Sequence, residues 1–406
     1  FLYKNSFYLE EFFFYIYKKG DCIMIGKKLD FETVSVRGYS GGDKLTGAIS
    51  YPIYQSATFK HPELNKSTGY DYSRTNNPTR EEVERTLCLL EDGIGAVAFS
   101  TGVAAISACI HLFKPNDHII ISEDLYGGTF RLFKDIYSVF GIKASFVDTS
   151  KLDEIKNSIY ENTKAIFIET PSNPLMRVSD IKEISYICKA SNLILIVDNT
   201  FLTPYFQKPL SLGADIVIHS GTKFLGGHND VLAGFLVTNN NDILSKIKLI
   251  QNSIGATLSS FDSWLILRGI KTLHIRVEKA QENALIISKY LNLNLKVEKV
   301  YYVGLEDHIG HEINSKQSTG SGSMISFRVK DKSLIPYILK NLSIISFAES
   351  LGGVETLITY PFTQTHSEIP KELKDKLGID ENLLRLSVGI ESINDLLNDL
   401  KSVLED

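Results

Sequence analysis

The 406-residue sequence has little of several features that mark special classes of protein. It holds four cysteines, Cys22, Cys88, Cys109 and Cys188, which are scattered and form no CxxC pair. This usage is typical of free thiols in a reducing compartment, so we expect a cytoplasmic protein. Charges of both signs are spread along the chain, with a formal net charge of -5. Because no basic block could follow a phosphate backbone, we expect no nucleic-acid partner.

The sequence also lacks a long apolar run. Residues 1–23 are rich in aromatic side chains, but Glu10 and Glu11 interrupt them, and a membrane span needs about 20 apolar residues. We therefore expect no membrane partner. The chain begins with Phe1, whereas Met24 opens an ordinary mixed stretch. Residues 1–23 are accordingly predicted to be a non-native or disordered N-terminal extension.

From about Glu82, short β-branched runs alternate with helix-like segments, a pattern typical of an α/β domain with a mostly parallel sheet. The runs are apolar throughout, which indicates that both faces of the sheet are covered. Helices are expected between them, one of them with Ser179 as its N-cap. The expected strands are 96–100, 118–122, 143–148, 164–170, 193–200, 215–220 and 234–238, and the expected helices are 102–113, 151–163 and 179–191.

The pattern of predicted helices and strands changes after about Leu267. A long helical pattern over 274–292 is followed by strand-like stretches at 323–330 and 383–391, which predict a smaller α+β domain. The stretch before the alternating region has few regular signals and is interpreted as an extended arm that contacts a neighbouring subunit. The predicted division is an arm over 24–75, a large domain over 76–267 and a small C-terminal domain over 268–406.

Polar residues gather directly after the predicted strands, where ligands bind in open α/β sheets. Strand 96–100 is followed by Gly102 and Val103 at the start of a helix, whose backbone N–H groups would face an anion. The other strand ends contribute hydroxyl, carboxylate, amide, aromatic and cationic side chains, namely Tyr126, Arg131, Asn173, Asp198, Ser220, Thr222 and Lys223.

One ligand would account for this set: a phosphorylated aromatic aldehyde that contains a ring nitrogen. Lys223 could condense with the aldehyde, Asp198 could keep the nitrogen protonated and Tyr126 could stack on the ring. Hydroxyls and a helix N-terminus could hold the phosphate. Each residue alone has an ordinary explanation, such as a surface lysine or a turn-capping aspartate. Because five separate strand ends supply complementary groups, the sequence predicts pyridoxal 5'-phosphate.

Competing motifs match less well. Lys223 follows Thr222, whereas a phosphate-binding P-loop has the lysine before the hydroxyl residue. No GxGxxG follows the first strand, and no GxSxG elbow occurs. His219 and His228 lack cysteine or carboxylate partners at zinc-ligand spacing, so we expect no metal site.

Eight motifs between about Gly38 and the C-terminus carry a family resemblance: YDYSRTNNPTR, FSTGVAAI, DLYGGTFRLF, ETPSNP, VDNTF, HSGTKFLGGHND, AESLGGVETL and RLSVGIE. With them the sequence resembles the transsulfuration enzymes of cysteine and methionine metabolism, which use pyridoxal phosphate. The resemblance implies the aspartate-aminotransferase-like fold, PLP fold type I. Its large domain has a mostly parallel seven-stranded sheet, and an α+β domain follows.

The resemblance also implies roles for individual residues. Lys223 would form the Schiff base with the cofactor and then move protons, Asp198 would pair with the ring nitrogen, and Tyr126 would be the second catalytic residue, stacked on the ring. Two phosphate ligands would come from a neighbouring subunit, which implies a homo-oligomer, expected to be a tetramer. The implied phosphate site consists of Gly102, Val103, Ser220 and Thr222, joined by Tyr72 and Arg74 of the neighbour.

For the substrate, the resemblance implies that Arg385 clamps the α-carboxylate. Glu349 would bind a distal amino group, as in the enzymes that handle cystathionine, and Arg131 a distal carboxylate. A solvent-exposed arginine at a strand edge is the ordinary alternative for Arg385. Gly128 disfavours a methionine γ-lyase, which typically has cysteine there. The implied substrate site consists of Arg385, Asn173, Ser350, Glu349 and Arg131.

The stretch over 346–370 is closest to bacterial cystathionine γ-synthases. It implies replacement of the acyloxy group of O-acylhomoserine by cysteine to give cystathionine in methionine biosynthesis, with sulfide as a further acceptor. The family's γ-lyases share nearly all the motifs, so cystathionine γ-lyase stays an alternative. A non-catalytic regulatory protein on this fold is another, but the presence of Lys223, Asp198 and Arg385 argues against it.

Overall fold

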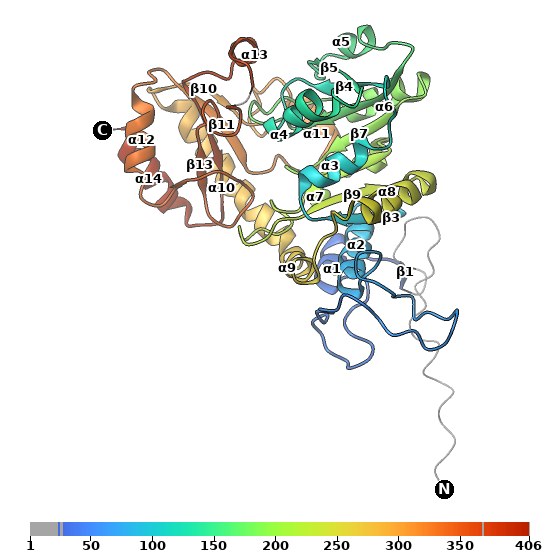
Figure 1. Cartoon of the computed structure of the whole chain (residues 1–406). Helices are drawn as coiled ribbons and strands as arrows, with labels where there is room; N and C mark the ends of the chain where they lie inside the picture. The colour runs from blue at the N-terminus through green and yellow to red at the C-terminus, as the bar shows by residue number, and fades with distance from the viewer. Residues whose placement is uncertain (1–22, 25–26, 368, 406) are drawn as a thin grey trace.

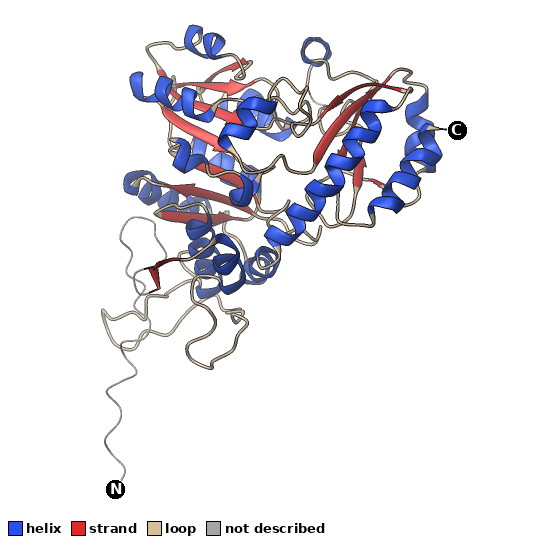
Figure 2. Ribbon diagram, turned by 180° about the vertical axis from the view of Figure 1, so that it is seen from behind, coloured by secondary structure: helices blue, strands red, loops and turns tan. Residues whose placement is uncertain are grey.

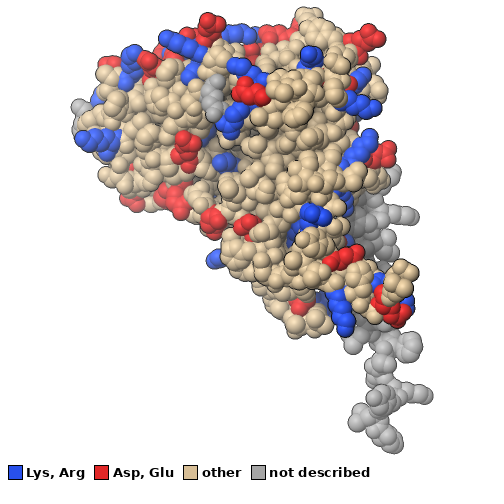
Figure 3. Space-filling model, viewed as in Figure 1, with Lys and Arg blue, Asp and Glu red and all other residues tan. Residues whose placement is uncertain are grey.

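The computed structural model describes residues 23–24, 27–367 and 369–405, arranged as two domains side by side with an arm below them (Figures 1 and 2). The expected N-terminal extension lies outside the described residues, apart from Ile23. Within the described part of the chain, no helix is long and apolar enough to cross a membrane. Acidic and basic side chains are interspersed on the face drawn in Figure 3.

The large domain is built on a seven-stranded sheet with the order β3-β9-β8-β7-β6-β4-β5. The β9 strand runs antiparallel to both neighbours, and the remaining pairs are parallel, which confirms the predicted mostly parallel sheet. The strands lie close to the expected ranges. They are β3 (Gly95–Phe99), β4 (His118–Ser122), β5 (Lys143–Val147), β6 (Thr163–Glu169), β7 (Ile194–Asp198), β8 (Ile216–Ser220) and β9 (Gly234–Thr238).

Helices cover both faces of this sheet, which is why its strands are apolar at successive positions. Leu195 and Val197 of β7 pack into the core cluster that includes α2 and α6, whereas Ile196 packs into the cluster on the other face with α3 and α8. The helical segments are α1 (Phe31–Arg37), α2 (Pro78–Leu90), α3 (Gly102–Ile110), α4 (Gly127–Arg131), η1 (Leu132–Tyr137), α5 (Leu152–Asn157), α6 (Ile181–Ala190), α7 (Thr203–Phe206), η2 (Pro209–Leu212), α8 (Asn241–Ile254) and α9 (Ser260–Ile270).

The outer edge of the sheet at β3 is closed by side chains. Glu84 Oε1 accepts a hydrogen bond from the Ala98 N–H at 2.9 Å, and Gln251 Nε2 donates to the Ala98 carbonyl at 2.6 Å. An unpaired strand edge is a template for pairing with another chain. At Ala98 this edge is therefore unavailable to a further strand.

The small domain contains a five-stranded sheet with the order β10-β11-β14-β13-β12, which confirms the expected smaller α+β domain. Its core joins this sheet to the long α10 helix and to α12 and α14. The elements are α10 (Leu273–Leu293), β10 (Val297–Tyr301), α11 (His311–Gln317), β11 (Met324–Val329), α12 (Leu334–Asn341), β12 (Ser346–Phe347), β13 (Leu357–Thr359), α13 (Lys371–Leu377), β14 (Leu383–Ser387) and α14 (Ile393–Leu404).

Two local predictions were wrong. Ser179 does not cap α6, because its N–H and hydroxyl are engaged by Thr170 and Thr149, and Asp180 accepts from the Glu183 N–H at 3.0 Å instead. The helix expected over 151–163 ends at Asn157, as β6 already begins at residue 163.

The arm is largely irregular from residue 38 to the start of α2 and hangs below the large domain in Figure 1. Near its start the arm forms a helix that was not expected, α1, which is anchored by the buried Val34 and by the Ser35 hydroxyl on the Ile270 carbonyl. A further short pair, β1 (Ile23–Met24) and β2 (Lys27–Lys28), precedes it. The predicted domain boundaries stay predictions.

Candidate active site

A cavity of about 420 Å³ lies beyond the carboxyl ends of the large-domain strands. It gathers residues that are far apart in the sequence but follow neighbouring strands of the sheet. Of the predicted site residues, it brings together Gly102, Val103, Tyr126, Arg131, Asn173, Asp198, Ser220, Thr222 and Lys223.

One wall of the cavity is the N-terminus of α3. Thr101 caps this helix by accepting from the Ala104 N–H at 3.0 Å. A Cβ atom on Gly102 would lie 3.0 Å from the Ser220 side chain, so glycine allows the helix to start directly against β8. The first N–H groups of a helix have no partner within it and attract anions. With the Ser220 and Thr222 hydroxyls beside them, they form a cradle suited to a phosphate.

Lys223 reaches into the cavity just after β8. Its Nζ donates to the Ser350 hydroxyl at 3.0 Å, which links the large domain to the small one. Burial, and then the neighbouring Arg385 cation, lower the pKa of Lys223 to about 8. A substantial fraction of this amine is therefore neutral near pH 7 to 8, as a nucleophile or base requires.

Asp198 ends β7 on the cavity wall. Its Oδ1 accepts from the Thr200 N–H at 3.0 Å and from the Thr200 hydroxyl at 2.6 Å. Burial raises the pKa of Asp198 above its ordinary value. Because a buried carboxylate is stabilised by a nearby cation, this position suits a ligand with a protonated nitrogen.

The Tyr126 side chain is partly exposed at the cavity. An added Cβ on Gly128 would lie 2.5 Å from Cε1 of the Tyr126 ring, so the ring lies where it does because residue 128 has no side chain. Any larger residue at this position would have to displace the ring.

Arg385 lies in β14, between β11 and β13, and only 1% of its surface is exposed. This burial rules out the exposed edge arginine considered as an alternative. Its Nη1 donates to Asn173 Oδ1 at 2.8 Å, and its Nη2 donates to the Ser350 carbonyl at 3.0 Å and to Thr359 Oγ1 at 3.2 Å. Among the described residues its Nε has no hydrogen-bond partner. The guanidinium is thus held at the interface of the two domains.

Glu349 lies on the small-domain side of the site. Its side chain is exposed, and its negative charge acts on both Lys223 and Arg385, raising the pKa of each against the effect of burial. Arg131 lines the cavity from the end of α4. The site therefore offers charged groups of both signs around the lysine.

The structure does not bring Tyr72 and Arg74 into this cavity. They lie on the arm, where the Arg74 guanidinium stacks 5.4 Å from the Tyr72 ring centroid and its Nε donates to Asn252 at 3.2 Å. They line a different pocket of about 300 Å³. Their contribution to a neighbouring subunit stays a prediction.

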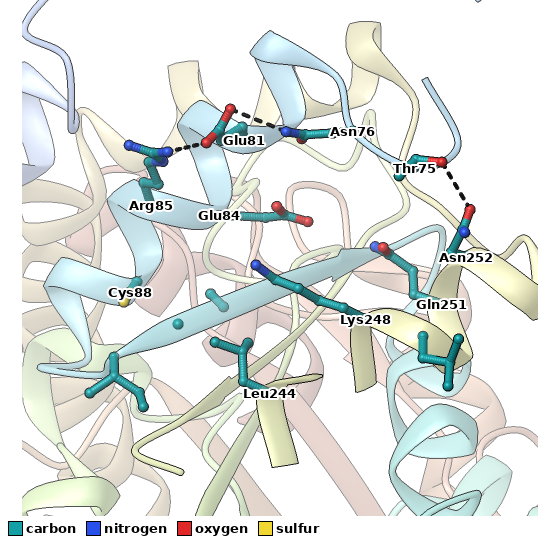
Figure 4. Close-up of a pocket in the computed structure, with 14 residues that line it drawn as sticks. Thr75, Asn76, Glu81, Glu84, Arg85, Cys88, Leu244, Lys248, Gln251 and Asn252 are labelled. Carbon is teal, nitrogen blue, oxygen red and sulfur yellow. Dashed lines mark hydrogen bonds and ion pairs between the residues drawn. The ribbon is translucent and has the colours of Figure 1, made fainter. Parts of the chain in front are cut away.

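A larger groove, of about 580 Å³, lies outside β3 and is not the Lys223 cavity (Figure 4). Glu84 and Lys248 both point into it from opposite walls, and Arg85 pairs with Glu81 at its rim. This groove lies away from the carboxyl ends of the strands, where ligands bind in such sheets. Although it is larger than the Lys223 cavity, it is therefore not the candidate active site.

Sequence reasoning missed some residues of the site. Glu169 lines the cavity next to Asp198, Thr200 orients Asp198, and His366 donates from Nε2 to the Asn173 carbonyl at 3.1 Å. A signal existed for Glu169, because it lies near the end of a predicted strand, as Asp198 does. No such signal marks His366, which approaches from the small domain.

The profile of one protein family, described as Cys/Met metabolism PLP-dependent enzyme, matches residues 32–405. The chain belongs to this family. Pyridoxal phosphate is therefore its cofactor, and the strand-end cavity has the amine, the buried carboxylate, the aromatic ring and the anion cradle that this cofactor needs. The cofactor prediction is confirmed.

Individual relatives within the family carry different activities. A cystathionine β-lyase of Lactococcus lactis subsp. cremoris (strain MG1363) is 51% identical over 92% of this chain and 98% of its own length. A cystathionine γ-synthase/O-acetylhomoserine (thiol)-lyase of Bacillus subtilis (strain 168) is 47% identical over 89% of this chain and 93% of its own. The crystal structure of cystathionine γ-lyase from Lactobacillus plantarum, complexed with L-serine, is 42% identical and superposes with a TM-score of 0.90 over 93% of this chain and 100% of its own.

These likenesses confirm PLP fold type I and the place of the chain among the transsulfuration enzymes. They do not select one reaction, because a β-lyase, a γ-lyase and a γ-synthase are all similar over nearly the full chain.

Proposed function

We propose that the active site binds cystathionine, a thioether with an amino-acid group at each end, and that the enzyme cleaves one of its carbon–sulfur bonds. The single observation that carries the binding of cystathionine is the placement of Glu349, whose charge acts on both Lys223 and Arg385. A substrate whose α-carboxylate lies on Arg385 and whose Cα lies at Lys223 would extend its distal amino group toward this exposed carboxylate.

The residues of the chain divide the chemistry among themselves. Arg385 binds the α-carboxylate through its guanidinium, whose Nε has no hydrogen-bond partner among the described residues. Lys223, neutral in part near pH 8, removes the Cα proton and returns it later. When bound, the pyridine ring of the cofactor supplies an electron sink for the negative charge left at Cα.

The groups around the cofactor keep that sink effective. Asp198 would hold a proton at the ring nitrogen, and Tyr126 would stack on the ring. The N–H groups of Gly102 and Val103, with the Ser220 and Thr222 hydroxyls, would hold the phosphate. Arg131 faces a distal carboxylate, and Asn173 and Ser350 orient Arg385.

The 51% identity to a β-lyase favours cleavage of the bond between Cβ and sulfur. This reaction converts cystathionine and water to homocysteine, pyruvate and ammonia. Cleavage at Cγ would instead give cysteine, 2-oxobutyrate and ammonia, and the similarity to a γ-lyase structure supports it as the near alternative.

Synthesis is the second candidate, and it is the reaction that the sequence favours. The γ-synthase reaction joins O-acylhomoserine and cysteine, releasing the carboxylic acid. It is supported by the stretch around Glu349 and by the 47% identity to the Bacillus γ-synthase.

The discriminating experiment offers purified enzyme cystathionine alone, and separately O-acetylhomoserine with cysteine or with sulfide. We expect keto acid from cystathionine, with pyruvate and 2-oxobutyrate separated by chromatography. Faster formation of cystathionine from O-acetylhomoserine would overturn the cleavage proposal in favour of the γ-synthase. No turnover of any of these compounds would overturn both.

We also propose that the enzyme is a homo-oligomer, expected to be a tetramer, in which Tyr72 and Arg74 reach the phosphate of a neighbouring subunit. The arm exposes large apolar side chains, with 86% of Leu45, 75% of Ile49 and 91% of Leu64 exposed, and such surfaces mark protein interfaces. Sedimentation of the intact chain, with Arg74→Ala tested for cofactor affinity, checks this arrangement.

A further inference from the structure

Glu169 occupies a central place in the site that the chemistry above does not use. It is the last residue of β6, and its register partner is Asp198, the last residue of β7. Both carboxylates are buried, with 7% and 8% of their surfaces exposed, and both line the cofactor cavity. A second buried carboxylate beside Asp198 costs free energy unless hydrogen bonds offset the cost.

Those contacts reach the backbone of two different loops. Glu169 Oε2 accepts from the N–H of Tyr126 at 3.1 Å, and the carboxylate also accepts from the N–H of Asn173. The aromatic side chain of Tyr126 is the one proposed to stack on the cofactor. Asn173 Oδ1 accepts from Arg385 at 2.8 Å. One side chain thus joins the loop of the cofactor ring to the loop of the substrate clamp.

The second of these loops is also held from the small domain. His366 is buried and donates from Nε2 to the Asn173 carbonyl at 3.1 Å, and it contacts the Leu125 backbone next to Tyr126. Burial, and then the charge of Arg385, lower the pKa of His366 to about 4, so the ring is neutral at physiological pH. The backbone N–H groups of Tyr126 and Asn173 thus face Glu169. The Asn173 carbonyl and the Leu125 backbone face His366.

We propose that Glu169 is a positioning residue that sets Tyr126 and Asn173 at a fixed separation. Loss of its two acceptor contacts then weakens cofactor binding and substrate binding together. Burial first, and then the charge of Asp198, raise the pKa of Glu169 well above its ordinary value. Its role therefore depends on oxygen acceptors rather than on a permanent negative charge.

The test compares Glu169→Gln, which keeps an oxygen acceptor and the length of the side chain, with Glu169→Met, which keeps the length and removes the acceptors. For the Met variant we expect the Kd of pyridoxal phosphate for the apoenzyme, and the KM of the amino-acid substrate, each to rise about tenfold. The Gln variant should restore both constants to within about threefold of wild type.

Glu123→Gln is the matched control. Glu123 precedes the same loop but pairs with Arg177 at 3.1 Å and Lys376 at 2.8 Å, outside the cofactor cavity. We expect it to leave both constants within about twofold. If Glu169→Met does not accumulate as a folded protein, Glu169→Ala takes its place in the comparison.

Two results would overturn the proposal. A folded Met or Ala variant with unchanged cofactor Kd and KM would show that the loops do not need Glu169. A Gln variant as impaired as Met would show that the charge acts, not the acceptors. The KM part rests on the proposed function, but the cofactor titration needs no turnover, so failure of the cleavage assay would leave that part intact.

Discussion

The proposed cofactor half and the proposed substrate half of the site are built differently. In the cofactor half, Asp198 and Ser220 end neighbouring strands of one sheet, and Thr200 contacts both of them. In the substrate half, Arg385 comes from the other domain and reaches across to Asn173. Cofactor binding therefore depends mainly on the fold of the large domain, whereas substrate binding depends on how the two domains are docked.

Lys223 belongs to the first half and is tied to the second by its hydrogen bond to Ser350. Three classes of variant are therefore expected. Changes at Lys223 affect both halves, changes of Arg385 that keep its charge affect substrate alone, and loss of the Arg385 charge affects Lys223 only through its pKa.

The largest effect is expected for Lys223→Ala. Without the amine, the Cα proton has no base, and turnover of the amino-acid substrate should fall by roughly 10³-fold or more. The visible absorbance of the attached cofactor should also be lost. Lys248→Ala, in the groove outside β3, is the control and should behave as wild type. A Lys223→Ala protein with near wild-type kcat would contradict the assignment.

An intermediate effect is expected for Arg385→Lys, which keeps the charge but not the forked donor geometry. We expect KM for the substrate to rise about 10- to 100-fold, with the cofactor Kd changed by less than about threefold. Arg328→Lys, on the neighbouring strand β11, tests for a general effect on the small domain and should leave KM unchanged. Equal losses of cofactor and substrate binding in Arg385→Lys would mean that the halves are not separable.

The smallest effect concerns pH. Only the neutral amine of Lys223 attacks the cofactor aldehyde, so the rate of attachment to apoenzyme should rise with pH and level off above about 8. Removing the cation in Arg385→Met should move this midpoint upward, since Arg385 lowers the pKa. It should stay below the ordinary lysine value of 10.5, because burial is the larger cause. Stopped-flow absorbance of apoenzyme mixed with pyridoxal phosphate measures it, and an unmoved midpoint would exclude coupling across the domains.

The gathering of Gly102, Asp198 and Lys223 in one cavity could be predicted from the sequence, because these residues lie at the ends of recognisable apolar strands. Gly102, Asp198 and Lys223 needed only the rule that ligands lie beyond the carboxyl ends of strands. The order of the strands was not predictable in this way. The pairing of β6 with β7 places Glu169 beside Asp198, and a sequence gives no direct sign of such a neighbour.

The substrate half was less predictable from residue patterns. From the residue pattern, an exposed strand edge was the ordinary alternative for Arg385, and the sheet order and its burial place it in the interior. His366 contacts a carbonyl of the other domain, so no local sequence spacing indicates that this residue belongs to the site. The predicted N-cap of α6 was wrong for a related reason, because neighbouring hydroxyls already engage Ser179.

The hydrogen bonds of Arg385 have a consequence for the thermodynamics of binding. Its guanidinium is already immobilised by Asn173, Thr359 and the Ser350 carbonyl before any carboxylate arrives. Freezing a long side chain costs roughly 0.5–1.5 kcal/mol of conformational entropy, and here that cost falls on folding instead of on association. Small amino acids, which have few atoms with which to offset such a loss, meet a rigid receptor for their carboxylate.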